Sequence, residues 1–274
     1  MQVESGLNAI SIDVEEWYQT TLINGNNFSN TESTSLLKNI DEILSLFEEC
    51  NTKATFFIVG SVVKQYPDIV RMIAERGHEL ASHGYFHKLV YRMSKQEFSR
   101  DLALSLDVLR ESAQTNILGY RAPTWSIIND AHWAVDILQA AGLRYDSSIY
   151  PFSFNLIKSR KLERFPYKIN DNFIEFPPST FKFLNYNLPF CGGMFLRNFP
   201  LSFIKNKIIE INAKGHPAMV YLHSWEFDSQ AAKFKIPNWK RLIQYSNIGS
   251  VKGKLLELLQ SFKFTSIKEV LQLR

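Results

Sequence analysis

The chain has 274 residues, of which 45% are hydrophobic and 21% charged, so it can build a sizeable core and is not disordered. The net charge of +4 is small for this length, and no run of Lys or Arg indicates a nucleic-acid-binding surface. The two cysteines, Cys50 and Cys191, do not form a CxxC pair, which argues against a disulfide scaffold and against a cysteine zinc site.

The N-terminal residues give no sign of a targeting segment. Residues 1–6 lack the basic region and apolar run of a signal peptide, and no apolar stretch approaches the ~20 residues of a membrane span. We therefore expect a cytoplasmic protein with no transmembrane segment, with peripheral association with the inner membrane as an alternative. The oligomeric state stays open.

The first third of the chain alternates apolar runs with helical periodicity. Residues 8–12 are a strand-like run that ends in an acidic and aromatic cluster at residues 13–18. From residue 36 to 47, apolar residues recur at helical spacing. Residues 54–59 form a buried strand, and residues 66–76 a helix with Gly77 as its natural end. A further short strand leads to His83.

The alternation continues to the C-terminus. Ser94 and Glu97 form a capping box that opens a helix, and Asn129 caps another that ends at Gly142. Later helices are expected from Leu201 and over residues 254–261. Further strands are expected at residues 117–120, 143–145, 173–176, 218–222 and 262–267.

Short apolar strands alternate with helices about eight times, which predicts an α/β fold with a parallel sheet and, at this length, a barrel. No linker is visible, so residues 1–274 are expected to form a single domain. Residues 151–199 are aromatic, irregular and punctuated by prolines, and we expect them to be a loop-rich insertion over one mouth of the barrel.

Two histidines, His83 and His87, follow a strand at a spacing of four. If the chain turns helical there, both side chains fall on one face, within reach of one ion. Neutral imidazoles at this spacing suit a divalent metal such as zinc. The alternative is one exposed histidine and one core histidine.

In a parallel barrel the active site lies at the carboxyl ends of the strands. Ionisable residues stand at five such ends: Asp13 and Glu15, His83 and His87, Arg121, Asp146, and His223. Each alone has an ordinary structural explanation, but together they predict a metal site. Two histidines and one carboxylate leave open positions on a metal, and a second carboxylate and a further histidine can move protons. This combination suits the hydrolysis of an amide or an ester.

These residues also form motifs that resemble those of the polysaccharide deacetylases, carbohydrate esterase family 4. The motifs occur in the family's order and are Ser-Ile-Asp13-Val-Glu15-Glu-Trp, Ser82-His83-x3-His87, Arg121-x-Pro123-x-Trp125, Asp146-Ser147-Ser148 and Leu222-His223-Ser224-Trp225. Glu175-x-Pro177 and Cys191-Gly192-Gly193 look like the subgroup that includes exopolysaccharide-locus deacetylases and one branch of peptidoglycan deacetylases.

The resemblance implies a distorted (β/α) barrel with seven or eight parallel strands and a divalent metal, usually zinc. It implies that Asp13 is the general base and that Arg121 orients it. Glu15, His83 and His87 would be the metal ligands.

The resemblance also implies the other half of the site. His223 would be the general acid, with Asp146 setting its orientation and charge. Leu222, Trp125 and Trp225 would shape a pocket for the acetyl methyl group.

The first motif departs from the commoner family form, which has two adjacent aspartates. Here the acids are one residue apart, so both Glu15 and Glu16 are candidate ligands. Because residues i and i+2 share a face of a strand, Asp13 and Glu15 can point into the site while Glu16 points away. We therefore choose Glu15.

The sequence therefore predicts a metal-dependent de-N-acetylase that acts on N-acetylhexosamine residues of a bacterial surface polysaccharide, or of its precursor, in exopolysaccharide or cell-wall metabolism. The expected partner is an N-acetylated glycan and not a nucleic acid. Alternatives are a small-amide or cyclic-amide hydrolase on the same barrel, and a non-catalytic carbohydrate-binding relative. A glycosidase fits less well, since paired histidines near the acids indicate a metal site.

Overall fold

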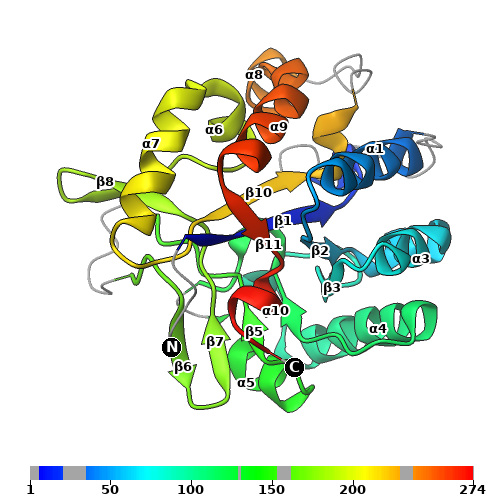
Figure 1. Cartoon of the computed structure of the whole chain (residues 1–274). Coiled ribbons are helices and arrows are strands. Elements are labelled where there is room, and N and C mark those ends of the chain that lie inside the picture. The colour runs from blue at the N-terminus through cyan, green and yellow to red at the C-terminus, as the bar shows by residue number, and fades with distance from the viewer. Residues whose placement is uncertain (1–5, 21–34, 129–130, 153–161, 229–236, 274) are drawn as a thin grey trace.

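A curved sheet of nine strands forms the centre of the protein (Figure 1). The computed structural model describes residues 6–20, 35–128, 131–152, 162–228 and 237–273. The strands of this sheet are β1 (Leu7–Val14), β2 (Thr55–Ile58), β3 (Glu79–Ser82), β4 (Gly119–Tyr120), β5 (Tyr145–Asp146), β6 (Tyr167–Asn170), β7 (Phe173–Glu175), β10 (Met219–His223) and β11 (Lys263–Thr265).

The strand order is β10-β1-β2-β3-β4-β5-β7-β6, and β11 pairs with the start of β1. All pairings are parallel except that of β6 with β7. Eight of the nine strands are therefore parallel, and they curl into a half-barrel flanked by helices. This confirms the predicted α/β fold and distorted barrel.

The central strands are covered on both faces. Every residue of β2 and β3 is buried, as is every residue of β1 after Leu7. Two-sided burial explains why β2 reads as a nearly continuous apolar run, whereas β1 and β3 also carry buried polar residues. It also means that a polar side chain on them is held in a water-poor setting.

Helices flank the sheet. They are α1 (Ser35–Glu49), α2 (Gly60–Gln65), α3 (Asp68–Glu75), α4 (Lys95–Ala113), α5 (Trp133–Ala140), α6 (Gly193–Asn198), α7 (Leu201–Asn212), α8 (Asn238–Tyr245), α9 (Val251–Ser261) and α10 (Ile267–Val270). Figure 1 shows α1, α3 and α4 on one side of the sheet and α6, α7 and α8 on the other. Among the described residues, no helix has the length and apolar character needed to cross a membrane.

Local signals placed several of these helices correctly. The Ser94 hydroxyl accepts from the main-chain N–H of Glu97, and the Glu97 carboxylate accepts from the N–H of Ser94, so the capping box at the start of α4 is formed. Gly77 has φ +75° just after α3. The predicted cap at Asn129 lies outside the described residues.

Residues 151–199 are more regular than expected. Beyond residue 161 they contain β6 and β7, which extend the main sheet, followed by the hairpin of β8 (Thr180–Phe183) and β9 (Tyr186–Pro189) and by α6. The prediction of a loop-rich insertion is therefore wrong for this part, because β7 pairs in parallel with β5 and completes one side of the half-barrel.

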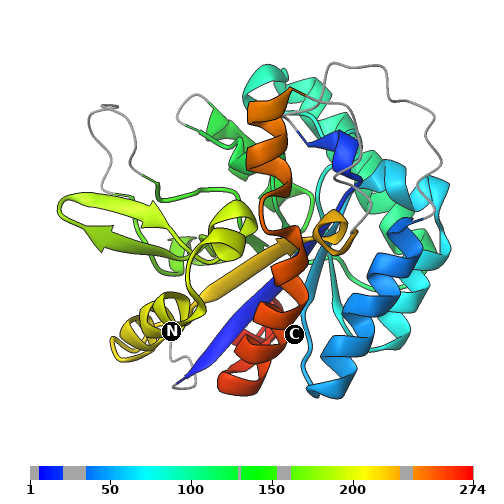
Figure 2. The same ribbon diagram turned by 90° about the horizontal axis from the view of Figure 1, so that it is seen from above.

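The first and last strands of the sheet along the chain, β1 and β11, pair with each other near the β10 edge. Strand β1 lies between β10 on one side and β2 and β11 on the other, and Figure 2 shows β1 and β10 running side by side. Gly192 lies against β10, where an added Cβ would come within 1.9 Å of the Tyr221 ring. A glycine there allows α6 to start directly beside the end of β10.

Candidate active site

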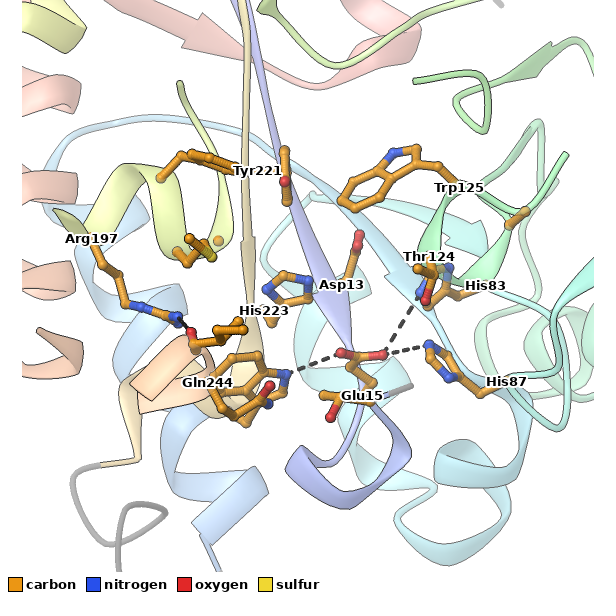
Figure 3. Close-up of a pocket in the computed structure, with 17 residues that line it drawn as sticks. Asp13, Glu15, His83, His87, Thr124, Trp125, Arg197, Tyr221, His223 and Gln244 are labelled. Carbon is orange, nitrogen blue, oxygen red and sulfur yellow. Dashed lines mark hydrogen bonds and ion pairs between the residues drawn. The ribbon is translucent and has the colours of Figure 1, made fainter. Parts of the chain in front are cut away.

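A cavity of about 210 Å³ opens at the carboxyl ends of β1, β3 and β10 (Figure 3). Its lining brings together five of the residues predicted from strand ends, which are Asp13, Glu15, His83, His87 and His223, and it also includes Trp125 and Trp225. The sequence prediction did not include the other residues of the lining, among them Thr124, Arg197, Tyr221 and Gln244.

Glu15, His83 and His87 form a buried cluster whose ligand atoms lie within 4.8 Å of one another. Glu15 Oε2 is 2.6 Å from His87 Nε2 and 4.0 Å from His83 Nε2. Both imidazoles thus present the same nitrogen to one carboxylate. This two-histidine, one-carboxylate set is the donor set of an open divalent-metal site.

The protonation states of the cluster fit a metal. Burial lowers the pKa of His83 to about 4, so its imidazole is neutral at physiological pH. Burial alone would raise the pKa of Glu15, but the charge and hydrogen bond of His87, with the charges of His223 and His83, lower it to about 2. A neutral imidazole beside an ionised carboxylate is what a divalent cation requires of its ligands.

The two histidines lie on a turn, so the helical arrangement considered for them is wrong. Gly84 has φ +72° and His87 has φ +54°, and no helix spans the segment. Asp101 on α4 shapes the turn, because its carboxylate accepts the main-chain N–H groups of Tyr85 at 2.7 Å and Phe86 at 3.1 Å. The two imidazole centroids nevertheless lie 5.1 Å apart.

Arg121 joins the metal cluster to Asp13. Its Nη1 donates to Asp13 Oδ1 at 2.6 Å, and its main-chain oxygen lies 2.7 Å from His83 Nδ1. With Nδ1 protonated and donating to that oxygen, His83 keeps Nε2 free for a metal. The guanidinium is fully buried and lies 4.1 Å from the Phe57 ring centroid, which limits its movement.

Glu16 is not part of the cluster. Its main-chain N–H donates to Gln19 Oε1 at 2.8 Å, where a short 3₁₀ turn begins after β1. Glu15 instead follows the alternation of the strand and lies on the same side as Asp13. The choice of Glu15 over Glu16 as a candidate ligand therefore agrees with the geometry.

His223 lies at the end of β10 and is bound by Glu226. Glu226 Oε2 is 3.1 Å from His223 Nδ1 and also accepts the main-chain N–H of His223 at 2.9 Å. Glu226 Oε1 in turn accepts from Arg197 Nη1. The sequence feature that could have identified Glu226 is its position three residues after His223, which is the spacing of a capping box.

Asp146 does not contact His223, and the expectation that it orients this histidine is wrong. Its Oδ1 accepts from the main-chain N–H of Ser147 at 2.9 Å and from the Ser148 hydroxyl, and it does not line the cavity. Asp146 is the register partner of Glu175 on β7. The curvature of the sheet carries the end of β5 away from the end of β10.

Asp146 and Glu175 form a fully buried carboxyl pair. Burial raises the pKa of Asp146 to about 7, and burial with the charge of Asp146 raises that of Glu175. Asp146 Oδ2 and Glu175 Oε2 have no donor among the described residues. A proton shared between these two oxygens satisfies both atoms.

The prediction that Leu222 shapes the pocket is also wrong. This residue is fully buried in the main hydrophobic core and does not line the cavity. Side chains alternate along β10, so Tyr221 and His223 face the site while Leu222 faces the core. The alternation of side chains along a strand could have identified Tyr221 from the sequence, since Tyr221 stands two residues before His223.

The aromatic residues enclose the cavity. The Trp225 ring stacks on His223 with centroids 5.2 Å apart, and its Nε1 donates to Glu15 Oε1 at 3.0 Å. The Trp125 ring centroid lies 4.7 Å from that of Tyr221. Figure 3 shows Trp125 and Tyr221 on one side of Asp13, with Glu15 and His87 on the other.

Comparison with known proteins finds similarity to one family over part of the chain. Residues 34–145 match the model described as polysaccharide deacetylase, and the peptidoglycan deacetylase of Helicobacter pylori is 28% identical over 110 residues, 40% of this chain and 36% of that protein. This part of the chain is similar to the polysaccharide deacetylases. The alignments span only about a third of the length of the curated relatives.

Solved structures of this family share the fold. A structure from Mycobacterium smegmatis assigned to the polysaccharide deacetylases has 18% identity and a TM-score of 0.68, and the match covers 98% of this chain and 90% of that one. A family pseudoenzyme from Bacillus anthracis also matches, at 14% identity and a TM-score of 0.56, over 98% of this chain and 66% of that one. Structural likeness at this level of identity shows the fold and not the activity.

The candidate site spans more than the polysaccharide deacetylase match. That match contains His83, His87 and Arg121, whereas Asp13 and Glu15 precede it. Residues 147–272 match a domain of unknown function, DUF3473, which contains Arg197, His223 and Glu226. Because β10 pairs with β1, which pairs with β2, and β7 pairs with β5, the two matched segments share one sheet.

Proposed function

We propose that the chain is a metal-dependent de-N-acetylase that hydrolyses the N-acetyl group of N-acetylhexosamine residues in a bacterial surface polysaccharide or its precursor. The observation that carries the proposal is the Glu15, His83 and His87 cluster with Asp13 and His223 on the same cavity. The similarity of residues 34–145 to the polysaccharide deacetylases and the named activity of the Helicobacter pylori relative support it.

Glu15, His83 and His87 would hold the metal, for which zinc suits the nitrogen and oxygen donors. When bound, such an ion lowers the pKa of a water molecule and polarises a carbonyl oxygen. Asp13 would act as the general base that takes the proton from the attacking water. Arg121 would keep Asp13 in place through the 2.6 Å contact at Oδ1.

His223 would act as the general acid. An amide nitrogen leaves poorly unless it is protonated as the C–N bond breaks, so a proton donor has to reach it. Burial alone would lower the pKa of His223, but the hydrogen bond and charge of Glu226, with the charges of Glu15 and Asp13, raise it to about 9. The ring therefore carries a proton to deliver at neutral pH.

The size of the cavity suits part of a glycan. About 210 Å³ accommodates an acetamido group with adjoining sugar atoms but does not enclose an oligosaccharide, so the rest of a polymer would stay outside. Trp125, Tyr221 and Trp225 offer aromatic faces around the acetyl methyl group and the sugar ring.

The test is metal analysis of the purified protein, followed by detection of free amines on a panel of N-acetylated glycans, with cyclic amides in parallel. We expect a divalent metal and free amines from N-acetylhexosamine polymers or oligomers. Turnover of the cyclic amides alone would assign a different amide hydrolase. Failure on every amide and ester, with metal bound, would indicate a non-catalytic relative.

A further inference from the structure

Glu226 makes two contacts with the same histidine through one oxygen. Its Oε2 lies 2.9 Å from the main-chain nitrogen of His223 and 3.1 Å from Nδ1 of the ring. The Glu226 side chain is fully buried, whereas the His223 side chain keeps 17% of its surface exposed. The contact therefore lies on the protein side of the ring and leaves Nε2 for the cavity.

Arg197 fixes the other oxygen of Glu226. The two side chains are in direct contact, and both are almost completely buried. Arg197 Nη2 donates to the main-chain oxygen of Ile243 at 2.8 Å, and its guanidinium lies 5.5 Å from the Trp225 ring centroid. The Arg197 side chain is therefore itself held by α8 and by Trp225.

The helix that bears Arg197 is anchored as well. Lys254 Nζ donates to the main-chain oxygens of Leu196, Arg197 and Phe199 at 2.6–2.9 Å, at the C-terminal end of α6. Gly192 and Gly193 bring the start of this helix against Tyr221 and His223. A chain of contacts thus connects α9 to α6 through Lys254, and Arg197 of α6 to His223 through Glu226.

We propose that Glu226 and Arg197 are a positioning pair that keeps a proton on His223 Nδ1 and presents Nε2 to the leaving group of the substrate. Glu226 does not line the cavity, and the Arg197 side chain, which does, is almost completely buried, so both act through the ring. The proposal rests on the proposed function and assigns a role to the segment of unknown function, which supplies the proton-donating half of the site.

The charges around the ring agree with this role. Burial alone would raise the pKa of Glu226, but the Arg197 charge and the contact with His223 lower it, so Glu226 stays ionised. The other acids that act on His223 are Glu15 and Asp13 of β1, and its ring neighbours are Tyr221 and Trp225. Of these acids, Glu226 alone bonds to Nδ1 among the described contacts.

The test compares the parent with Glu226→Gln on two substrates: an N-acetylated chitooligosaccharide and an activated aryl acetate whose leaving group needs no proton. We expect kcat on the amide to fall about 10²–10³-fold and kcat on the ester to fall less than about 10-fold. His223→Ala should give the same selectivity. Glu111→Gln, an exposed carboxylate on α4, is the matched control and should change neither rate.

Nitrogen NMR of the metal-loaded protein provides a readout independent of turnover. At neutral pH the parent should show both ring nitrogens of His223 protonated, and Glu226→Gln should leave the ring with a single proton. If the parent hydrolyses no substrate, the proposed function fails, and the NMR result alone decides the positioning role. Equal losses on both substrates, no loss on either, or an unchanged imidazole signal would overturn the proposal.

Breaking a buried ion pair can prevent folding, so a second variant is needed. Arg197→Gln combined with Glu226→Gln removes both members of this ion pair, so neither is left as an unpaired buried charge. It should fold with normal metal content, lose amide hydrolysis selectively, and show the same NMR change. If this folded variant keeps the parent's ratio of amide to ester rates, the positioning role is wrong.

Discussion

Asp13 and His223 are register partners on the adjacent parallel strands β1 and β10. Register partners in a sheet point to the same face, so the candidate base and the candidate acid project from neighbouring positions into one cavity. The hydroxyl of Ser224, which follows His223, donates to the main-chain oxygen of Glu15 at 2.7 Å and fixes the two strand ends to each other. The spacing of the two proton-transfer groups is therefore set by backbone pairing.

Replacing His83 should remove metal. His83→Ala deletes one of three proposed protein ligands, so metal content measured by mass spectrometry after dialysis should fall well below that of the parent. His216→Ala, which loses a ring stacked on Phe165 away from the cavity, is the control and should keep the parent's metal content. Full metal content in His83→Ala would mean that the cluster is not the metal site.

Asp13→Asn should keep metal and lose turnover. Asparagine preserves the shape of the side chain and removes the basic site, so the proton of the attacking water has no acceptor. The rate should fall about 10²–10⁴-fold at unchanged metal content. Loss of metal in this variant would make Asp13 a ligand and would reverse the roles given to Asp13 and Glu15.

Asp101→Asn should weaken metal binding from outside the cavity. The carboxylate accepts two main-chain N–H groups in the turn between His83 and His87, and an amide offers only one oxygen for them. Metal affinity, measured by competition with a chelator, should fall about 10–100-fold. Asp107→Asn, an exposed change on the same helix, should have no effect, and equal affinities would show that Asp101 does not support the turn.

Asp146→Asn should change how stability depends on pH. The pKa of Asp146 is raised to about 7 in the folded protein, so the native state keeps a proton that the unfolded chain loses above about pH 4. This contribution to stability is complete below pH 4 and is lost as pH rises through 7.

The measurement for Asp146 is the free energy of unfolding in urea at pH 5 and pH 8. The parent should lose more stability between these values than Asp146→Asn, whose amide can donate to Glu175 without a shared proton. Asp171→Asn, at a fully exposed position, should behave like the parent. An identical pH dependence in Asp146→Asn and the parent would exclude the shared proton.

Much of the candidate site could be predicted because of one rule of the fold. Parallel strands deliver their carboxyl ends to one rim, so a polar residue after each apolar run marks the site. Asp13, Glu15, His83, His87 and His223 all follow this rule. Apolar periodicity and capping residues similarly placed α1, α4 and α7.

The predictions that are wrong concern contacts that depend on the curvature of the sheet and on helices distant in the sequence. Which acid meets His223 depends on how far the sheet curls between β5 and β10, and strand spacing in the sequence does not give this. The turn at His83 depends on Asp101, a residue of α4 with no local sequence link to it. The predicted role of Leu222 is wrong because it stands one position before His223 on β10, where strand alternation turns its side chain into the core.

Metal titration of metal-free protein tests the central claim most directly. Zinc should be added in increments to the stripped protein while acetate release from an N-acetylated chitooligosaccharide is measured. The account predicts no release without metal and a rate that rises to a plateau at one equivalent per chain, since one cluster of three ligands is present among the described residues. A full rate of acetate release from the metal-free protein would contradict it.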